Sequence, residues 1–442
     1  MTVVGVVGTS ARAAVHSLAR AGFRAWAVDL FADRDLKRAA DCVVCPHDRY
    51  PDAIPALAAQ FPPGPVLYTG GLENYPHIVA ELARARELRG NLPEVLARVR
   101  GPFALASALT AAGFATPKLV PASEPCPPEG RWLRKPLRSS GGLGIRFAQP
   151  GEAPSPHHCF QELIAGTPMS AIFVDGTLLG ITEQLIGESW LHAPPFAYCG
   201  NIGPITLDAR ATLTVARLGQ LLAAETGLRG MWGLDFILGG DAPFPLEVNP
   251  RYTAAVEVLE WGHKAQPTPP GPRPEGKGEL AREPAVLETT FADISFSPFP
   301  SGRGGGGVGC GPNPSPTPPL NGEGLKTIAE RSVPILFGSV PPSFLGKGGR
   351  GLGSSPLIGK AIYYAPHAIT FPPRGPWDAD LAGAFDPWRV PTFADIPEPG
   401  SAIETGWPVL TLFVAGTAPA EVRERLQSRA AELDRLFAEH SP

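Results

Sequence analysis

The first hundred residues alternate short apolar runs with segments whose apolar residues recur at helical spacing. The run "VVGVVG" is uninterrupted, which is typical of a strand covered on both faces. "SARAAVHSLARAGF" has the helical pattern with a glycine near its end, and "RAWAVDL" is a second apolar run. The alternation continues through 52–61, 65–70 and 76–88. This β-α-β order predicts a parallel, Rossmann-like sheet and one α/β domain over residues 1–101.

A second globular region follows, in which predicted strands outnumber helices. Apolar spacing predicts helices over 102–113 and 212–227, each closed by a glycine. In "GMWGLDFILGGDAPFPLEVNPRYT" (230–253), two alternating runs are joined by Gly-Gly-Asp, which predicts a hairpin. The apolar side chains of the first run share one face, and those of the second run do the same: Trp232, Leu234, Phe236 and Leu238, then Phe244, Leu246 and Val248.

The opposite face of this hairpin carries the chemistry. A hairpin would set Asp235 across from Glu247 and Asn249, with Arg251 on the same side of the second run. Two carboxylates and an amide oxygen are hard ligands that suit Mg²⁺, which also keeps waters and phosphate oxygens. Arg251 would then face a phosphoryl group or an acyl phosphate. The alternative is a solvated polar face on an edge hairpin, but that would not need Asn-Pro-Arg on a fixed backbone.

A lysine followed by a glycine-rich loop forms the second candidate site. In "RWLRKPLRSSGGLGIRF", strand alternation puts Leu133, Lys135 and Leu137 on one side. The loop 139–144 offers backbone N–H groups with little steric cover, so it can close over phosphate oxygens that the lysine neutralises. The order differs from a Walker A loop, in which the glycines precede the lysine. Taken alone, the stretch is equally compatible with a flexible turn between two strands.

Composition changes sharply over residues 267–356, where roughly two residues in five are Pro or Gly, as in low-complexity segments. Such a segment cannot bury enough apolar area to offset chain entropy, so most of it is expected to be disordered. Globular sequence resumes with "LIGKAIYYAP", and the chain ends in an expected helix over 419–440. We therefore expect four regions: 1–101, 102–266, the insertion 267–356, and 357–442, which completes the second domain.

If the insertion is a surface excursion, its removal leaves the rest intact. Replacing residues 268–355 by a short Gly/Ser linker is expected to give a soluble protein with the same ligand affinity and similar turnover, because loop length adds slowly to closure cost. Limited proteolysis is the first check, with cuts expected between 267 and 356. A trimmed protein that aggregated or lost ligand binding would contradict the interpretation of this segment as a surface excursion.

The net charge and the cysteine content limit the classes of partner and the cellular locations that we expect. The net charge of −4 over 442 residues gives no sign of a nucleic-acid or membrane partner. No apolar run reaches the roughly 18 residues of a membrane span, and the N-terminus lacks the basic region of a signal peptide. A cytoplasmic location is the default expectation, with all six cysteines as free thiols.

Three smaller motifs have ordinary structural explanations. Gly5 and Gly8 do not fit G-x-G-x-x-G, so a tight turn is preferred to a dinucleotide fingerprint. Cys42 and Cys45 form a single C-x-x-C without the second pair that a zinc site needs. His16 and His192 lack evident partners and are expected to be structural or exposed.

The order of these elements resembles the ATP-grasp superfamily, and more closely its carboxylate–amine ligases near the tyramine–glutamate ligase-like enzymes. The resemblance rests on Lys135, the glycine-rich loop, "FQELIAGTPMS", and "DFI" followed by "EVNPR". It implies an α/β ATP-grasp fold preceded by a Rossmann-like, pre-ATP-grasp domain and interrupted by the long low-complexity insertion.

The resemblance also implies residue roles. Lys135 would contact the nucleotide phosphates, and the backbone of "QELI" would read adenine. Asp235, Glu247 and Asn249 match the family's ligands for Mg²⁺ or Mn²⁺, and Arg251 matches its transition-state arginine. The complete nucleotide-binding set is Lys135, Ser139, Ser140, Gly141, Gly142, Gly144, Gln161, Glu162, Leu163 and Ile164.

This sequence departs from many relatives at two positions. The first metal ligand is Asp rather than the commoner Glu, and an upstream nucleotide-binding lysine is missing. Arg98 and Arg100 are the available substitutes. Glu73, Asn74 and Asn201 could face the acceptor substrate, although turn chemistry explains them almost as well.

The expected function is therefore an ATP-dependent ligase that joins a small-molecule carboxylate to an amine through an acyl phosphate, releasing ADP and phosphate. One alternative is a carboxylase- or carbamoyl-phosphate-type enzyme, weakened by the absence of an evident biotin-carrier segment. The other is a nucleotide-binding protein whose catalysis was lost to the insertion. Substrate identity and oligomeric state stay open at this point.

Overall fold

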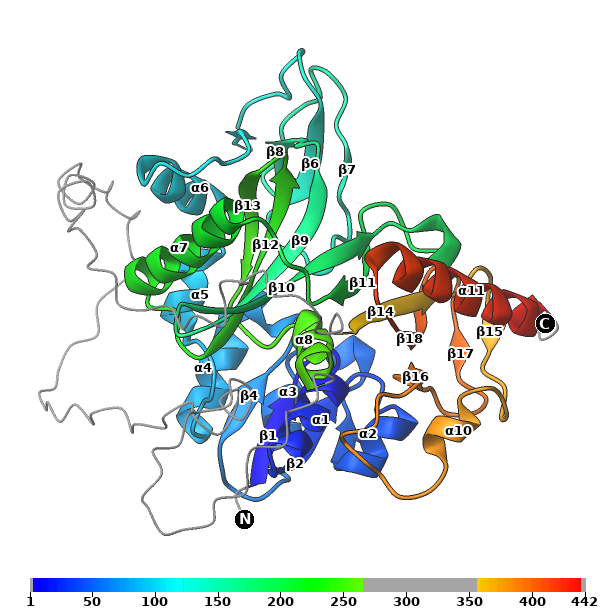
Figure 1. Ribbon diagram of the computed structural model, residues 1–442. Coiled ribbons are helices and arrows are strands. Elements are labelled where there is room, and N and C mark those ends of the chain that lie inside the picture. Colours follow the sequence, from blue (N-terminus) through cyan, green and yellow to red (C-terminus); the bar gives the residue numbers. More distant parts are fainter. Residues whose placement is uncertain (1–2, 122, 265–355, 439–442) are drawn as a thin grey trace, which may run out of the picture.

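The computed structural model describes residues 3–121, 123–264 and 356–438 (Figure 1). Of the insertion, only Pro356 falls within these ranges, so the expected disorder and the linker replacement concern residues outside the description. Among the described residues, no helix is both long and apolar enough to cross a membrane.

The N-terminal region forms the expected parallel sheet, with strand order β3-β2-β1-β4 and helices around it. Val6, Ala27 and Val28 are fully buried, as the uninterrupted apolar runs predict. The strand β3 holds Cys42, the first cysteine of the C-x-x-C, and Cys45 directly follows the strand. The elements are β1 (Val3–Val7), α1 (Arg12–Arg20), β2 (Arg24–Asp29), α2 (Arg34–Ala39), β3 (Asp41–Val44), η1 (His47–Arg49), α3 (Ile54–Ala58), β4 (Val66–Tyr68), η2 (Leu72–Asn74), α4 (Pro76–Ala85) and α5 (Pro93–Val99).

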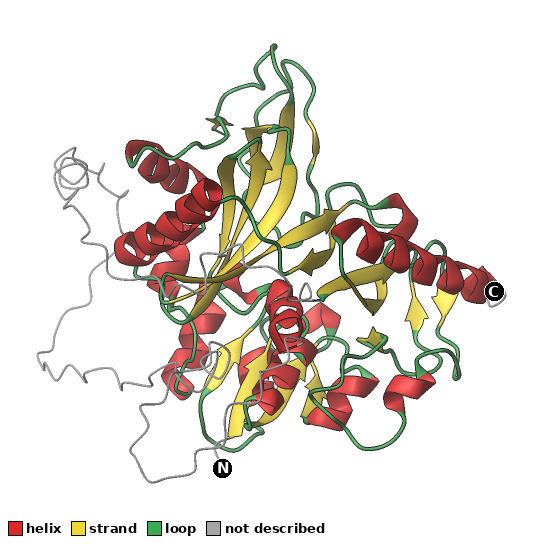
Figure 2. Cartoon of the chain, in the orientation of Figure 1, coloured by secondary structure: helices red, strands yellow, loops and turns green. Residues whose placement is uncertain are grey.

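The second region contains a small antiparallel sheet and most of a large one (Figure 2). The small sheet has strand order β5-β8-β6-β7 and projects above the rest of the molecule in Figure 1. The elements are α6 (Pro102–Ala111), β5 (Leu119–Val120), β6 (Trp132–Pro136), β7 (Arg146–Phe147), β8 (His158–Glu162), β9 (Thr167–Val174), β10 (Thr177–Ile186), η3 (Ser189–Leu191), β11 (Tyr198–Gly203), α7 (Ala209–Thr226), β12 (Met231–Gly239), β13 (Ala242–Asn249) and α8 (Ala254–Lys264).

Residues after the insertion continue the large sheet, which has eight antiparallel strands in the order β13-β12-β9-β10-β11-β14-β18-β16. The chain therefore returns, after residue 355, to the sheet that it left at β13. The elements are β14 (Leu357–Tyr364), β15 (Ile369–Thr370), α10 (Asp378–Leu381), β16 (Phe393–Ala394), β17 (Ala402–Ile403), β18 (Pro408–Gly416) and α11 (Pro419–Ala438).

Strand alternation gives the large sheet one apolar and one polar face near β12. Trp232 and Phe236 are fully buried in a cluster with Val215 and Leu218 of α7, so this helix covers the apolar face. Directly paired residues of antiparallel strands lie on the same face. The register therefore aligns a polar row on the other face: Glu247 with Asp235, Asp235 with Ser170, and Ser170 with Thr182.

A buried charge cluster holds the N-terminal domain against α8 and β14. Glu257 of α8 is fully buried and accepts hydrogen bonds from the Arg12 guanidinium and, at 2.9 Å, from Lys360 Nζ. Arg12 Nε also donates to Asp395 Oδ1 at 2.8 Å. Burial alone would raise the pKa of Glu257, but Arg12 and Lys360 outweigh it and hold that pKa well below its ordinary value. The charged form of Glu257 is therefore part of the folded structure.

Glu257→Gln is expected to lower the free energy of unfolding by about 3–5 kcal/mol, because it leaves two buried cations short of a counter-charge. Urea unfolding followed by circular dichroism measures this. Glu398→Gln is the matched control, because the Lys37–Glu398 pair is exposed and its loss is expected to cost less than about 1 kcal/mol. Equal stabilities of the two variants would show that the buried cluster does not secure the domain.

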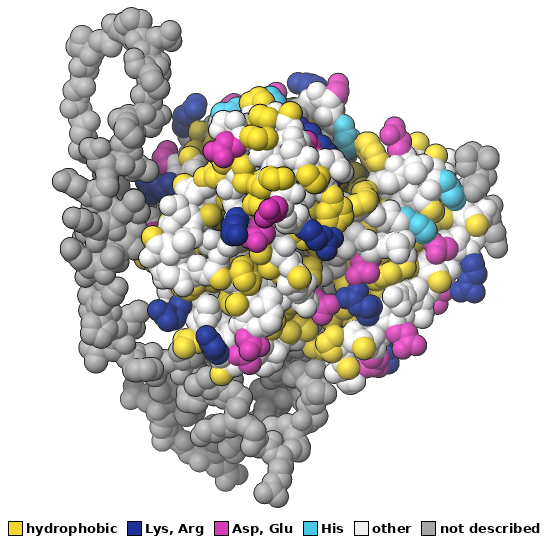
Figure 3. Space-filling model, turned by 90° about the horizontal axis from the view of Figure 1, so that it is seen from above, with side chains coloured by type: hydrophobic (Ala, Val, Ile, Leu, Met, Phe, Trp, Pro, Cys, Tyr) yellow, Lys and Arg dark blue, Asp and Glu magenta, His cyan; other side chains and the backbone are white. Residues whose placement is uncertain are grey.

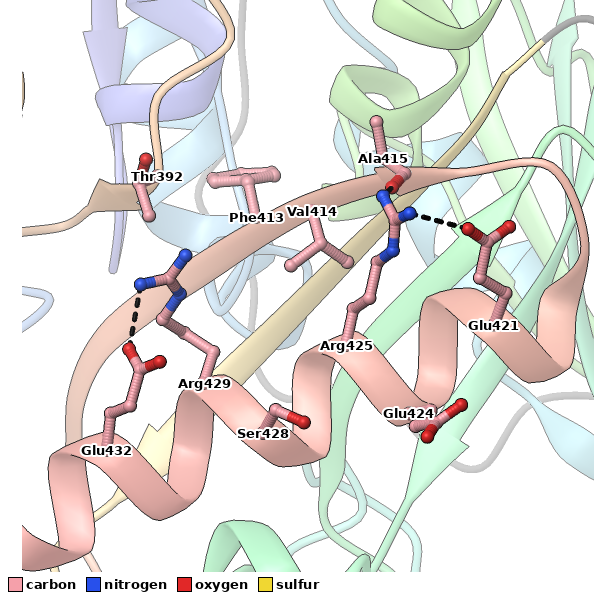
Figure 4. Close-up of a pocket in the computed structure, with 10 residues that line it drawn as sticks. All are labelled: Thr392, Phe413, Val414, Ala415, Glu421, Glu424, Arg425, Ser428, Arg429 and Glu432. Atoms are coloured by element: carbon pink, nitrogen blue, oxygen red, sulfur yellow. Dashed lines mark hydrogen bonds and ion pairs between the residues drawn. The ribbon is translucent and has the colours of Figure 1, made fainter.

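The outer surface offers a groove away from the polar row. Acidic and basic side chains are interspersed with apolar ones on the face that Figure 3 shows. Between α11 and β18 lies a groove of about 600 Å³, crossed by the Arg425–Glu421 and Arg429–Glu432 pairs (Figure 4). Its lining consists of Thr392, Phe413, Val414, Ala415, Glu421, Glu424, Arg425, Ser428, Arg429 and Glu432. None of the site residues predicted from the sequence belongs to this lining.

Candidate functional site

The predicted hairpin forms and brings its two acidic residues together. The register pairs Asp235 of β12 with Glu247 of β13, and Gly233 with Asn249. Asn249 Nδ2 donates to Asp235 Oδ2 at 2.8 Å, and Gln184 Nε2 donates to Asp235 Oδ1 at 3.0 Å. Burial and then the charge of Glu247 raise the pKa of Asp235 to about 6. The two carboxylates thus repel each other in a partly desolvated place.

Two cations reach Glu247 from other parts of the chain. Lys135 Nζ of β6 lies 3.6 Å from Glu247 Oε2, and Arg100 Nη1 pairs with Glu247 Oε1. Burial would raise the pKa of Glu247, but Lys135 and Arg100 outweigh it and the pKa is lowered. Arg100 also donates to Asn74 Oδ1 at 2.7 Å and to the Ser139 carbonyl at 3.1 Å. Arg100 therefore joins the hairpin to the glycine-rich loop and to the end of the N-terminal sheet.

Arg251 is fixed at the end of the hairpin by contacts with the N-terminal domain. Its Nε and Nη2 donate to Glu73 Oε1 at 3.1 and 2.8 Å, and Nη2 also donates to Asn249 Oδ1 at 3.1 Å. The Pro250 carbonyl accepts hydrogen bonds from Tyr68 Oη at 3.2 Å and Asn91 Nδ2 at 3.0 Å. The Asn-Pro-Arg backbone is thus anchored to the carboxyl end of β4 and to the segment before α5.

The glycine-rich loop lies against the turn that precedes β11. Tyr198 N–H donates to the Gly141 carbonyl at 2.9 Å, and Asn74 Nδ2 donates to the Ser139 carbonyl at 3.3 Å. Gly142 has φ +77°, and a Cβ there would lie 1.9 Å from the Phe196 carbonyl oxygen. Only glycine therefore permits this close approach, which gives the sequence motif a steric reason.

The segment 161–164 leaves the small sheet at the Trp132 end of β6, whereas the glycine-rich loop follows the other end of that strand, at Pro136. Glu162 N–H donates to the Lys118 carbonyl and Leu163 N–H to the Arg131 carbonyl, both at 2.9 Å. The Glu162 side chain accepts from Lys118 N–H at 3.0 Å, and Gln161 is buried. The side chains of Gln161 and Glu162 therefore stabilise the local structure. If this segment binds a ligand, its backbone groups would make the contacts.

The donor set fits a divalent cation that also binds phosphate oxygens. Asp235 and Glu247 are opposed carboxylates whose mutual repulsion a cation would relieve, and Asn249 adds an amide oxygen. Among the described residues there is no cluster of three or more His, Cys, Asp or Glu suited to a metal. The set is thus incomplete as a closed protein cage, which suits Mg²⁺ better than a metal held by protein ligands alone.

The structure shows which of the remaining candidate residues lie at the site and which lie elsewhere. Arg98 Nη1 donates to the Thr226 carbonyl at an exposed position, so Arg100 and not Arg98 lies at the site. Asn201 is fully buried and its side chain is bonded to Thr182 and Tyr198, which makes it structural. His192 pairs with Asp434, and His16 is buried. The five cysteines among the described residues are free thiols, and Cys310 lies outside them.

Sequence reasoning missed three residues that position the site. Gln184 holds Asp235 across the sheet, Ser170 also hydrogen-bonds that carboxylate, and Asn91 anchors Pro250. Strand alternation on β10 and β9 could have placed Gln184 and Ser170 on the polar face. Asn91 carries no comparable signal, because the contacts of its side chain, with Arg229 and Pro250, are more than a hundred residues away along the chain.

Residues 102–255 match a family model described as the ATP-grasp domain, and the Lys135, hairpin and Arg251 positions all lie within the match. Residues 102–255 are thus similar to the ATP-grasp domain.

Three similar proteins illustrate the likeness. An uncharacterized protein of Methanocaldococcus jannaschii is 30% identical over 101 residues, 23% of this chain and 24% of that protein. The match thus spans about a quarter of this curated relative. An L-amino acid ligase from Bacillus licheniformis aligns with a TM-score of 0.58 at 12% identity, covering 98% of this chain and 97% of that one.

The third relative is the biotin carboxylase domain of 2-oxoglutarate carboxylase from Hydrogenobacter thermophilus, a dimer in complex with MgADP, ADP and bicarbonate. Its TM-score is 0.56 at 13% identity, covering 97% of this chain and 89% of that one. At such identities the two structures establish a shared fold, and the expected ATP-grasp fold class is confirmed.

Proposed function

We propose that this protein joins a small-molecule carboxylate to an amine, consuming ATP and releasing ADP and phosphate through an acyl phosphate. The observation that carries the proposal is the convergence on one polar face of Asp235, Glu247, Asn249, Arg251 and Lys135. Opposed carboxylates beside three cations, Lys135, Arg100 and Arg251, suit a polyphosphate with a divalent cation, not an ordinary solvated hairpin.

ATP and Mg²⁺ are the proposed cofactors, with Mn²⁺ as a substitute for the metal. Asp235, Glu247 and Asn249 would hold the metal, which supplies charge neutralisation at the transferring phosphoryl group. Lys135 and Arg100 would bind phosphate oxygens, and Arg100 takes the place of the missing upstream lysine. The MgADP bound in the Hydrogenobacter carboxylase domain supports this choice by fold analogy.

The chain's own groups orient the reactants. The loop 139–144 presents backbone N–H groups beside Lys135, and the backbone of 161–164 would hold the adenine. Arg251 would stabilise the charge that develops on the acyl phosphate, because its guanidinium is held in place by Glu73 and Asn249. We propose the same four regions as before, 1–101, 102–266, 267–356 and 357–442, and we assign catalysis to the junction of the first two.

A hydroxamate screen tests this function. Purified protein with ATP and Mg²⁺ is offered L-amino acids, dicarboxylates and hydroxy acids as carboxylates, with hydroxylamine as the nucleophile. An acyl phosphate would be trapped as a hydroxamate, with ADP and phosphate released in equal amounts. Phosphate release that depends on bicarbonate would favour the carboxylase alternative instead. Tight ATP binding without turnover on any carboxylate would favour the non-catalytic alternative.

A further inference from the structure

Glu73 lies beside Arg251 with only one of its two carboxylate oxygens hydrogen-bonded. Its side chain is 1% exposed, and Oε1 alone accepts both hydrogen bonds from the Arg251 guanidinium, at 3.1 and 2.8 Å. An Arg–carboxylate pair usually engages both oxygens through the fork of the guanidinium. Here Oε2 is buried and has no hydrogen-bond partner among the described residues. A buried carboxylate oxygen without a hydrogen-bond partner lowers the stability of the folded protein, so its presence indicates a functional role.

The surroundings of Glu73 are polar and lie at the carboxyl end of the N-terminal parallel sheet. Thr69, which directly follows β4, has a buried hydroxyl that is likewise without a partner among the described residues. Tyr50 Oη and Thr9 Oγ1 lie 3.3 Å apart next to Gly71, where a Cβ would come within 2.4 Å of that tyrosine oxygen. Burial first, and then contributions that include the charge of Glu73, raise the pKa of Tyr50 to about 12. Arg251 is thus the cationic partner of the Glu73 carboxylate, whose charge also acts on the Tyr50 hydroxyl.

We propose that Glu73 Oε2 binds the ammonium group of the amine substrate and accepts its proton next to the acyl phosphate held by Arg251. The inference rests on the proposed function and assigns the nucleophile to a chemical class, amines that are cationic before they react. Glu73 is suited to this because one oxygen fixes the arginine that binds the phosphoryl group. The other oxygen is buried and has no hydrogen-bond partner among the described residues, and a charge-assisted hydrogen bond is strong in such a place.

The step balances without any further reactant. The ammonium gives one proton to Glu73 Oε2, and its freed lone pair forms the C–N bond to the acyl carbon. The C–O bond to phosphorus-bound oxygen breaks, and the electron pair leaves with phosphate. The second proton lost by the nitrogen goes to the departing phosphate, and Glu73 later returns its proton to solvent. An uncharged nucleophile does not need the first of these transfers.

Glu73→Gln separates ammonium binding from support of Arg251, because glutamine keeps one carbonyl oxygen for the guanidinium and loses the charge. Methylamine, which is protonated near neutral pH like a lysine side chain, is compared with hydroxylamine, which is uncharged there. Both are used with the carboxylate that gives most hydroxamate in the wild type. The ratio of kcat/KM for methylamine to that for hydroxylamine is expected to fall about 10²-fold in E73Q, the order of a lost acid–base group.

Two further variants keep the result interpretable. Glu73→Asp retains the charge and is expected to restore much of the methylamine ratio. Glu183→Gln, on the opposite face of β10 and paired with Arg423, should leave the ratio unchanged. An unchanged ratio in E73Q, with both nucleophiles slowed equally, would show that Glu73 only supports Arg251 and would overturn the proposal. Failure of the proposed function is distinct, because the wild type itself would then form no hydroxamate.

Discussion

Glu247→Gln is expected to abolish most catalysis while leaving the fold intact, with turnover lower by about 10²-fold or more, as when a transition-state charge partner is lost. Glutamine keeps the shape of the side chain but removes one of the two opposed carboxylates. Lys135 and Arg100 would then face phosphate oxygens and a metal site with a weaker anionic partner. Phosphate release with the best carboxylate from the screen measures the loss, and circular dichroism checks the fold.

The matched control for Glu247 is Glu183→Gln, which removes a carboxylate from the other face of the same sheet. Glu183 pairs with Arg423 at 2.6 Å, away from the polar row. Its replacement should leave turnover within about twofold, as expected for surface changes away from functional sites. If the Glu247 variant also stayed within about twofold, Glu247 would not serve the reacting phosphate.

Lys135→Ala is expected to weaken ATP binding about tenfold or more, because a hydrogen bond between charged groups is worth about 1.5–3 kcal/mol. Binding of the free carboxylate substrate should change less, since the lysine is assigned to the nucleotide phosphates. Isothermal titration calorimetry with ATP measures the effect. Lys135 also approaches Glu247, so its loss is expected to slow turnover in addition to weakening affinity.

Arg134→Ala provides the control for Lys135 on the adjacent position of β6. Strand alternation turns Arg134 to the other side, where Nη1 donates to Glu152 Oε1 at 3.0 Å. ATP affinity should be unaltered in that variant. Unaltered affinity in Lys135→Ala would instead place the lysine away from the phosphates, and the structure offers Arg100 as the next cation to test.

The local pattern of apolar and polar residues was sufficient to predict strands and hairpins, because alternation and turn residues specify them directly. The runs around Asp235 and Glu247 predicted the hairpin and the opposition of these two carboxylates, and the register agrees. The prediction that Phe244 and Leu246 share a face with Val248 was wrong, because a register shift after Asp235 pairs Phe236 with Pro245 and Ile237 with Phe244. Apolar runs at the N-terminus predicted the parallel sheet. The helix expected over 212–227 begins earlier, at Ala209, because Asp208 caps it by accepting from Arg210 and Ala211 N–H groups.

Contacts between residues far apart along the chain could not be predicted from the sequence. Arg100 and Glu247 are 147 residues apart, and Glu73 and Arg251 are 178 residues apart, so no periodicity connects them. Sequence reasoning could name Glu73 and Arg100 only as candidates among several. Asn201 was a reasonable candidate for the same reason, and only the packing of Tyr198 and Thr182 around it shows that it is structural.

The most direct test of acyl-phosphate chemistry follows the carboxylate oxygen. The best carboxylate from the screen is labelled with oxygen-18 at its carboxyl group and incubated with the protein, ATP, Mg²⁺ and an amine. Because the carboxylate attacks the γ-phosphoryl group and the C–O bond later breaks, one labelled oxygen should appear in each phosphate released. Phosphate that carried no label while amide formed would contradict an acyl phosphate, and with it the proposed ligase mechanism.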